Sequence, residues 1–136
     1  MYDVTCQIFF SYGHRLLNYK GKCKNFHGHN GKVEVELSSD ELDARGMVFD
    51  FSDIKSVIKN WIDDHLDHRM ILNRKDPLLE ALQKAGEPLY VMDGNPTAEE
   101  IAKLIYEYAS SKKFPVSEVR LWETEQSFAT YHRKNR

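Results

Sequence analysis

Two histidines separated by one glycine, His27 and His29, open a run in which apolar and charged residues alternate as far as Leu37. Residues two apart in a strand project to the same side, so the two imidazoles share a face, with backbones about 6 to 7 Å apart. Two imidazoles at this separation can bind one ion at about 2.0 to 2.1 Å. The same tripeptide also fits an exposed loop, so the metal interpretation needs a third ligand.

His14 is the natural third ligand. It follows the first predicted strand, which should pair antiparallel with the strand that His27 and His29 begin. Three neutral imidazoles with an empty fourth position are typical of catalytic zinc. A fourth protein ligand, for which Cys23 is the candidate, would instead close the site and make it structural. The residues alone leave both arrangements open.

Cys23 lies in the run KGKCKNFHGHNGK, among Lys20, Lys22 and Lys24 and four residues before His27. Positive neighbours favour the thiolate form of a cysteine, and a thiolate near neutral pH can take a proton from a substrate. The sequence therefore allows three interpretations of Cys23: a base, a metal ligand, or a loop cysteine with no task.

Asp67 and His68 are adjacent where a predicted helix ends. The chain is free to turn there, so the carboxylate can orient the imidazole for proton exchange near pH 7. The alternative is a solvated polar helix end.

Glu123 continues the alternation of Val119 and Leu121 and should therefore face the buried side of its strand. A buried carboxylate needs a partner, unless the strand has already reached the rim of the sheet. A flat ring with adjacent N–H donors, such as a 2-amino-4-oxo pyrimidine, would suit it in bidentate fashion.

The hydrophobic periodicity predicts the elements that position these groups. Period-two alternation marks YDVTCQIFF, GKVEVELS, VSEVRLWETE and SFATYH as strands. Helical spacing marks FDFSDIKSVIKNWIDDHLDH, capped by Asp50 or Ser52, and NPTAEEIAKLIYEYA, where Thr97 and Glu100 form a capping box. Residues 69–89 read as irregular. This order predicts an α+β fold: a four-stranded antiparallel sheet with two helices on one face.

The chain has 136 residues, of which 41% are apolar, and a net charge of −2, which suits a single domain over residues 1–136. This balance gives no reason to expect nucleic acid or a membrane surface as a partner. Without a leader-like N-terminus, Cys6 and Cys23 are expected to be reduced thiols in the cytoplasm. A single sheet of this kind has edges and an uncovered face, so we expect an oligomer.

Six segments, in the same order, resemble one family over nearly the whole chain: the 6-pyruvoyl-tetrahydropterin and 6-carboxy-tetrahydropterin synthases of the tunnelling fold. The segments are FSYGHRL, CKNFHGHN, GMVFDFSDIK, LDHRMILN, NPTAEE and VRLWETEQSFATY. The resemblance implies a zinc-dependent lyase that acts on 7,8-dihydroneopterin triphosphate. It also implies that the sheets of three subunits join into a barrel and that two such rings stack into a homohexamer, with sites between subunits.

The resemblance also assigns roles to residues. Cys23 would be the general base, with Asp67 and His68 as its proton relay. Glu123 would anchor the pterin ring and join the relay. The zinc ligands it implies are His14, His27 and His29. The residues it places near the ring pocket are Thr97 and Glu99, and the triphosphate contacts it allows are Lys20, Lys22, Lys24 and Arg69.

The three residues between Cys23 and His27 resemble the carboxy-forming branch, which releases acetaldehyde and triphosphate and serves queuosine synthesis. The alternatives are the pyruvoyl branch, which eliminates triphosphate from the same substrate, and a pterin-binding protein without turnover. The chain departs from the family beside the site. Tyr12, followed by Gly13, stands where alanine is usual, and Gly31 stands where a side chain, often aromatic, follows HGHN.

Overall fold

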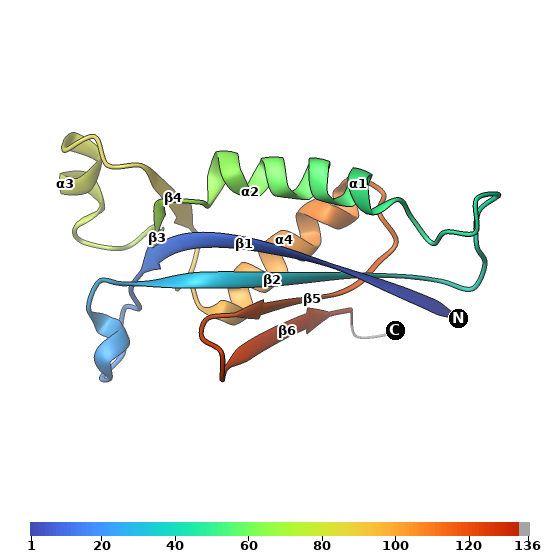
Figure 1. The fold of residues 1–136 in the computed structure, drawn as a ribbon. Coiled ribbons are helices and arrows are strands. Elements are labelled where there is room, and N and C mark those ends of the chain that lie inside the picture. The colour runs from blue at the N-terminus through green and yellow to red at the C-terminus, as the bar shows by residue number, and fades with distance from the viewer. Residues whose placement is uncertain (134–136) are drawn as a thin grey trace.

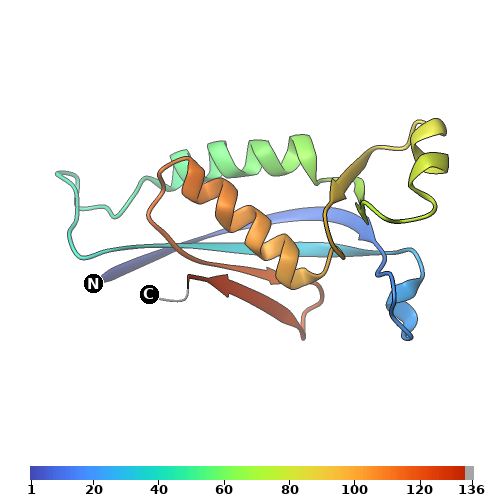
Figure 2. The same ribbon diagram turned by 180° about the vertical axis from the view of Figure 1, so that it is seen from behind.

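The computed structural model describes residues 1–133, which form a twisted six-stranded sheet with its long helices packed on one face (Figures 1 and 2). The strand order is β4-β3-β1-β2-β5-β6. At the centre, β1 (Tyr2–His14) and β2 (His27–Ser39) pair antiparallel over their whole length. On the other side of β2, β5 (Val116–Trp122) and then β6 (Phe128–His132) continue the antiparallel order. These are the four strands that the alternation predicts.

Two further strands correct the predicted sheet. β3 (Arg69–Asn73) pairs parallel with the end of β1, and β4 (Leu89–Met92) pairs parallel with β3. The short helix α3 (Leu79–Lys84) lies between them in the chain, as a parallel connection requires. The sheet is therefore six-stranded and mixed, and reading residues 69–89 as irregular is wrong. Strands of four or five residues are too short to show a clear period, which is why the pattern misses them.

The first long helix is one continuous segment made of α1 (Phe51–Ile54), the π-helical turn η2 (Lys55–Lys59) and α2 (Asn60–His65). The Asp50 carboxylate caps it by accepting from the Ser52 amide at 2.8 Å. Buried residues recur every four positions and face the sheet, as the helical spacing predicts. They are Ile54, Ile58, Ile62 and Leu66.

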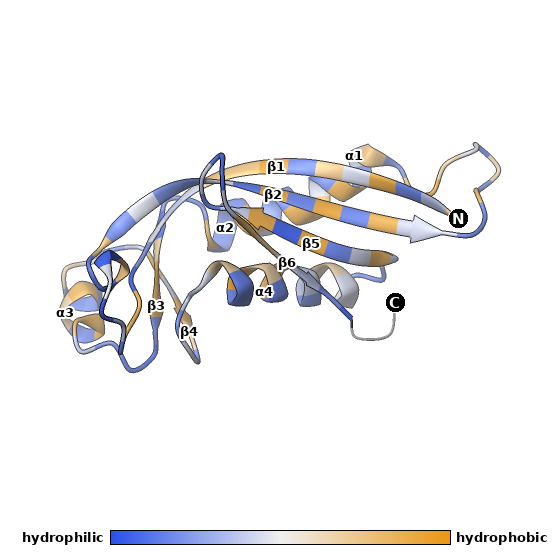
Figure 3. Cartoon of the chain, turned by 90° about the horizontal axis from the view of Figure 1, so that it is seen from below, coloured by the Kyte–Doolittle hydropathy of each residue, from blue (hydrophilic) through white to orange (hydrophobic). Residues whose placement is uncertain are grey.

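Helix α4 (Ala98–Ser111) crosses the same face of the sheet beside β5 (Figure 2). The Thr97 hydroxyl accepts from the Glu100 amide at 3.2 Å, so Thr97 is the N-cap that the sequence predicts. The core lies between the helices and the inner face of the sheet. Figure 3 shows the alternating apolar and polar bands along β1, β2 and β5 that create this inner face. No helix within residues 1–133 is long and apolar enough to cross a membrane.

The loop between β1 and β2, residues 15–26, carries Cys23 in the short 3-10 helix η1 (Lys22–Lys24) and is fixed at its base. The Arg15 guanidinium donates two hydrogen bonds to Asp76, one of them at 2.7 Å, and the Asp76 side chain is fully buried. The Asn95 side chain bonds both the amide and the carbonyl of Leu17, at 2.9 and 2.8 Å. The Leu16 amide donates to the Cys23 carbonyl at 2.8 Å. The loop is thereby attached to the segments that follow β3 and precede α4.

The Arg15–Asp76 pair gives a test of this anchoring. Replacing Asp76 by Asn should lower the free energy of unfolding by about 2 to 4 kcal/mol, because it leaves the guanidinium without its buried anion. The Arg15 guanidinium also holds the pKa of Asp76 below its usual value. The unfolded chain therefore binds this proton first, and the stabilisation, complete above about pH 4, is lost as pH falls through the lowered pKa.

Urea unfolding between pH 2 and pH 7 measures both effects. Asp93→Asn is the matched control, because Asp93 forms an exposed ion pair with Arg74 that should contribute little. Equal stability of Asp76→Asn and Asp93→Asn would contradict the anchoring role.

Candidate metal centre

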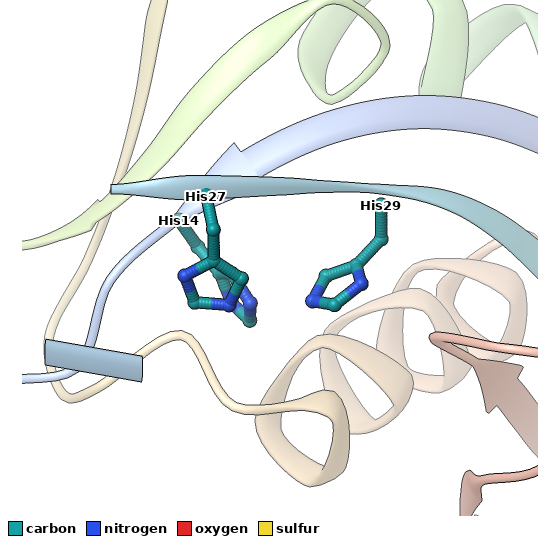
Figure 4. Close-up of side chains that lie close together, drawn as sticks. All are labelled: His14, His27 and His29. Carbon is teal, nitrogen blue, oxygen red and sulfur yellow. The ribbon is translucent and has the colours of Figure 1, made fainter. Parts of the chain in front are cut away.

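Three histidines on the inner face of the sheet point their rings toward one another (Figure 4). His14 ends β1 directly opposite His27, the first residue of β2, and His29 follows two positions along β2. The ring centroids lie 4.5 to 5.1 Å apart. One ring nitrogen from each residue falls within 4.8 Å of the other two, an arrangement that could hold a metal ion.

Two backbone carbonyls fix the tautomers of these rings. His14 Nδ1 lies 2.6 Å from the Pro96 carbonyl oxygen, and His27 Nδ1 lies 2.7 Å from that of Asn25. A carbonyl only accepts, so each Nδ1 carries the proton and each Nε2 presents a lone pair. Metal-binding histidines commonly donate their other ring N–H in this way.

The three Nε2 atoms are buried and have no hydrogen-bond partner. Burial, which opposes a charged ring, is the largest cause that lowers the pKa of His14 and of His29. The neighbouring histidines lower both values further, whereas Glu123 acts in the opposite direction. Neutral imidazoles with free lone pairs are the form that divalent metals bind. The residues present therefore fit a metal ion coordinated by three nitrogens.

Glu123 lies just past the end of β5, and its Oε2 is 2.9 Å from His29 Nε2. The contact lacks the alignment of a hydrogen bond, since Nε2 remains without a partner. A quarter of the carboxylate side chain is exposed. Glu123 thus lies at the edge of the histidine cluster, between the buried position and the wet rim that the alternation allows.

Tyr12 is a member of the cluster that the sequence reasoning noted only as a departure from the family. Its ring makes an edge contact with His14 and a tilted contact with His29, at centroid distances of 5.2 and 5.6 Å. The side chain is buried, and its hydroxyl has no hydrogen-bond partner. Burial, and secondarily the charge of Glu123, raises the pKa of Tyr12, so the phenol is neutral. Its place on the inner face follows from the period-two alternation that also carries His14.

Cys23 is a free thiol of intermediate burial and lies outside the group of converging nitrogens. Lys20, Lys22 and Lys24 are exposed on the same loop. The closed structural site, with Cys23 as fourth ligand, therefore gains no support from the arrangement. The hydrogen bond from the Leu16 amide to the Cys23 carbonyl ties Cys23 to the start of the loop, two residues after His14.

Asp67 and His68 form the pair that their sequence suggests. Asp67 Oδ2 accepts from His68 Nδ1 at 2.8 Å. Burial opposes ionisation of Asp67, but hydrogen bonds from the Ser11 amide and from His68 outweigh it and lower its pKa. The Ser11 carbonyl accepts from the His68 amide at 2.6 Å, which holds His68 at a positive φ of 58°. A non-glycine residue rarely adopts this conformation.

Within one chain the Asp67–His68 pair does not join the histidine cluster. The His68 side chain is 80% exposed and borders a surface depression that Tyr12, His27 and His29 also line in part. Three further residues of its wall are Ser11, Gly28 and Asn30. These three alternate with Tyr12, His27 and His29 along β1 and β2, so they belong to the opposite face of the sheet. Among residues 1–133, no hydrogen bond or ion pair connects the two groups.

The remaining predicted site residues that the structure describes, Thr97, Glu99 and Arg69, lie outside the histidine cluster. The Thr97 hydroxyl is engaged as the helix cap, and Glu99 is exposed in the first turn of α4. Pro96, immediately before this cap, supplies the carbonyl that orients His14. No sequence signal identifies Pro96, because its role uses a backbone atom 82 positions from its partner. Arg69 donates to the carbonyls of Leu89 and Asp64.

Comparison with known proteins adds independent information. The model of the 6-pyruvoyl tetrahydropterin synthase family matches residues 3–134. Two relatives named 6-carboxy-5,6,7,8-tetrahydropterin synthase, from Rickettsia felis and Haemophilus influenzae, are each 36% identical. The alignments cover 94% and 96% of this chain and 98% and 99% of the relatives.

A solved structure of 6-pyruvoyl tetrahydropterin synthase from Caenorhabditis elegans superposes with a TM-score of 0.69 at 27% identity, covering 98% of both chains. The α+β fold is therefore that of the pterin synthase structures. With a family match that spans nearly every residue, the chain belongs to the 6-pyruvoyl tetrahydropterin synthase family.

Proposed function

We propose that the protein is a zinc-dependent 6-carboxy-5,6,7,8-tetrahydropterin synthase. It converts 7,8-dihydroneopterin triphosphate and water to 6-carboxytetrahydropterin, acetaldehyde and triphosphate, as a lyase in queuosine precursor synthesis. The observation that carries the proposal is the convergence of three buried imidazole nitrogens without partners, in a chain 36% identical to relatives of that name. The three-residue spacing from Cys23 to His27 favours this branch over the pyruvoyl branch.

The metal is assigned to His14, His27 and His29, whose ligand nitrogens lie within 4.8 Å of one another. Zinc held there would supply a Lewis acid for negative charge on the side-chain oxygens of the substrate. Pro96 and Asn25 keep the rings oriented by accepting their Nδ1 protons. The loop anchors described above keep His14 and His27 at the same end of the sheet.

Glu123 is proposed to anchor the pterin ring. A carboxylate accepts two adjacent N–H donors in bidentate geometry, and the 2-amino-4-oxo ring offers them. Glu123 stands 2.9 Å from His29, so a ring bound to it extends its side chain toward the three histidines. Thr97 and Glu99 are proposed to border the ring pocket, from the start of α4.

Proton transfer is assigned to Cys23 as base and to the Asp67–His68 pair as relay. Asp67 fixes the His68 tautomer and leaves its Nε2 exposed to exchange protons. In a single chain this pair lies on the sheet face opposite the metal centre. We therefore propose a cytoplasmic homohexamer, a dimer of trimers, in which sites form between subunits. Lys20, Lys22, Lys24 and Arg69 are the proposed triphosphate contacts.

Metal content tests the ligand assignment without reference to activity. Purified wild-type protein should carry about one zinc per chain, and His27→Ala should lose most of it, since two imidazoles rarely retain zinc at low concentration. Elemental analysis after dialysis against a weak chelator measures this. His132→Ala changes an exposed histidine on β6 and should keep the metal. Full zinc retention by His27→Ala would contradict the assignment.

Turnover tests the reaction. Wild-type protein incubated with 7,8-dihydroneopterin triphosphate should release acetaldehyde and triphosphate, detected by mass spectrometry, and Cys23→Ala should reduce the rate by at least about 100-fold if Cys23 is the base. Cys6→Ala is the matched control, because Cys6 is buried in the core away from the loop. A pyruvoyl product without acetaldehyde would move the protein to the other branch. Unchanged turnover by Cys23→Ala would remove Cys23 from the mechanism.

If Glu123 anchors the pterin ring, replacing its carboxylate should weaken substrate binding. Glu123→Gln keeps the size of the side chain but loses the anion and turns an N–H toward the N–H donors of the ring, so KM should rise about 10- to 100-fold. Steady-state kinetics measures it. Glu125→Gln, an exposed neighbour in the turn before β6, is the control. If both variants had the wild-type KM, the ring would have to be anchored elsewhere.

A further inference from the structure

Within the described part of the chain, four buried side-chain atoms lack a hydrogen-bond partner, and all four belong to one cluster. Three are the Nε2 atoms of His14, His27 and His29, and a metal ion accounts for them. The fourth is the hydroxyl of Tyr12, which the metal leaves unexplained. Burying a hydroxyl without a partner is costly, so a buried hydroxyl of this kind indicates a ligand that completes it.

The Tyr12 ring fills the space that glycine leaves at residue 31. A Cβ built on Gly31 would lie 3.0 Å from Tyr12 Cε1, 3.2 Å from a Phe10 ring carbon and 3.4 Å from a Leu121 methyl. Gly31 has no positive φ, so an added side chain would meet crowding rather than backbone strain. The Tyr12 ring extends from β1 toward β2 over this position and stacks on Phe10 at 5.0 Å. Tyr12 and Gly31 therefore form a complementary pair in the wall of the site.

The Tyr12 ring stands between the two parts of the proposed site. It contacts the rings of His14 and His29 on the metal side. On the other side, His29 links it to the proposed ring anchor, because the His29 ring that Tyr12 contacts lies 2.9 Å from the carboxylate of Glu123. A pterin anchored on Glu123 and extended toward the histidines would bring its side chain beside the Tyr12 ring, which carries this hydroxyl.

We infer that Tyr12 is a substrate-binding residue whose hydroxyl hydrogen-bonds an oxygen of the hydroxylated side chain of the pterin. The inference rests on the proposed function and adds a specificity element to it. A neutral phenol both donates and accepts, so it suits an alcohol oxygen before reaction and a carbonyl oxygen afterwards. It makes no contact with the ring amide, which Glu123 engages. Tyr12 therefore selects for an oxygen-bearing side chain rather than for the pterin ring.

The test compares two probes on zinc-loaded protein: neopterin, which carries a hydroxylated side chain, and pterin, which has none. Tyr12→Phe should weaken neopterin binding by about 10- to 100-fold and leave pterin binding unchanged, because only the hydroxyl is removed. Zinc content and melting temperature should not fall. Tyr106→Phe is the control: its buried hydroxyl bonds the Val116 carbonyl at 3.4 Å, beside the other end of β2.

A second variant approaches the same contact from the opposite strand. Gly31→Ala should displace the Tyr12 ring and weaken neopterin binding in a similar way. In the Tyr12→Phe background it should add little, since the contact it disturbs is already lost. Additive losses in this cycle would show that Gly31 acts on binding by another route and would overturn the pairing.

Each other outcome also decides the inference. Equal affinity of Tyr12→Phe and wild type for neopterin would overturn it, as would an equal loss for both probes, which would assign the hydroxyl to the ring. Loss of zinc from Tyr12→Phe would make Tyr12 a metal ligand instead. The proposed function can fail independently of this inference. If wild-type protein bound neopterin more tightly than pterin but did not convert 7,8-dihydroneopterin triphosphate, the enzyme proposal would be wrong, and Tyr12 would remain a ligand-binding residue. Wild-type protein that binds neither probe would overturn both.

Discussion

The antiparallel register of β1 and β2 is the constraint on which the site depends. His14 faces His27 across the pair, and Tyr12 faces His29. Because side chains alternate between faces, a slip of one residue would send the histidines of one strand to the opposite side of the sheet. The histidine cluster therefore persists only while β1 and β2 keep this register. A metal ion that requires three converging nitrogens would in turn stabilise this register over its neighbours.

The core sets the register far from the metal. Along the same two strands, Cys6 faces Val35 and Ile8 faces Val33, and all four side chains are buried against the helices. Shifting one strand by a residue would expose this apolar face as well as scatter the imidazoles. Packing energy spread over the length of β1 and β2 thus holds the ligands at one end of them. The same period-two alternation along β1 and β2 therefore both buries the core residues and points the three histidines to one face of the sheet.

This alternation is also why the sequence reveals some features and conceals others. The strands β1, β2, β5 and β6 and the convergence of His14, His27 and His29 follow from period two and a long loop. The sequence does not predict β3 and β4, because they are short and lie in a segment interrupted by Pro77, Gly86 and Pro88.

Contacts between distant segments are similarly hidden from the sequence. The Pro96 carbonyl that orients His14 and the Asp76 carboxylate that holds Arg15 both come from loops whose path depends on the whole fold. Local pattern carries no information about contacts of this kind.

The contact between Tyr12 and Gly31 shows that two departures from a family pattern should be interpreted together when the residues are neighbours in the structure. Taken one at a time, a tyrosine in place of alanine and a glycine in place of a larger side chain look like two separate departures from the family. In the structure they are coupled, since the Tyr12 ring on β1 fills the space that Gly31 leaves on β2. The ring contacts His14 and His29 from β1, and its hydroxyl is buried without a partner. Which of two paired strands carries the large side chain thus decides the direction from which a polar group is presented beside the metal ligands.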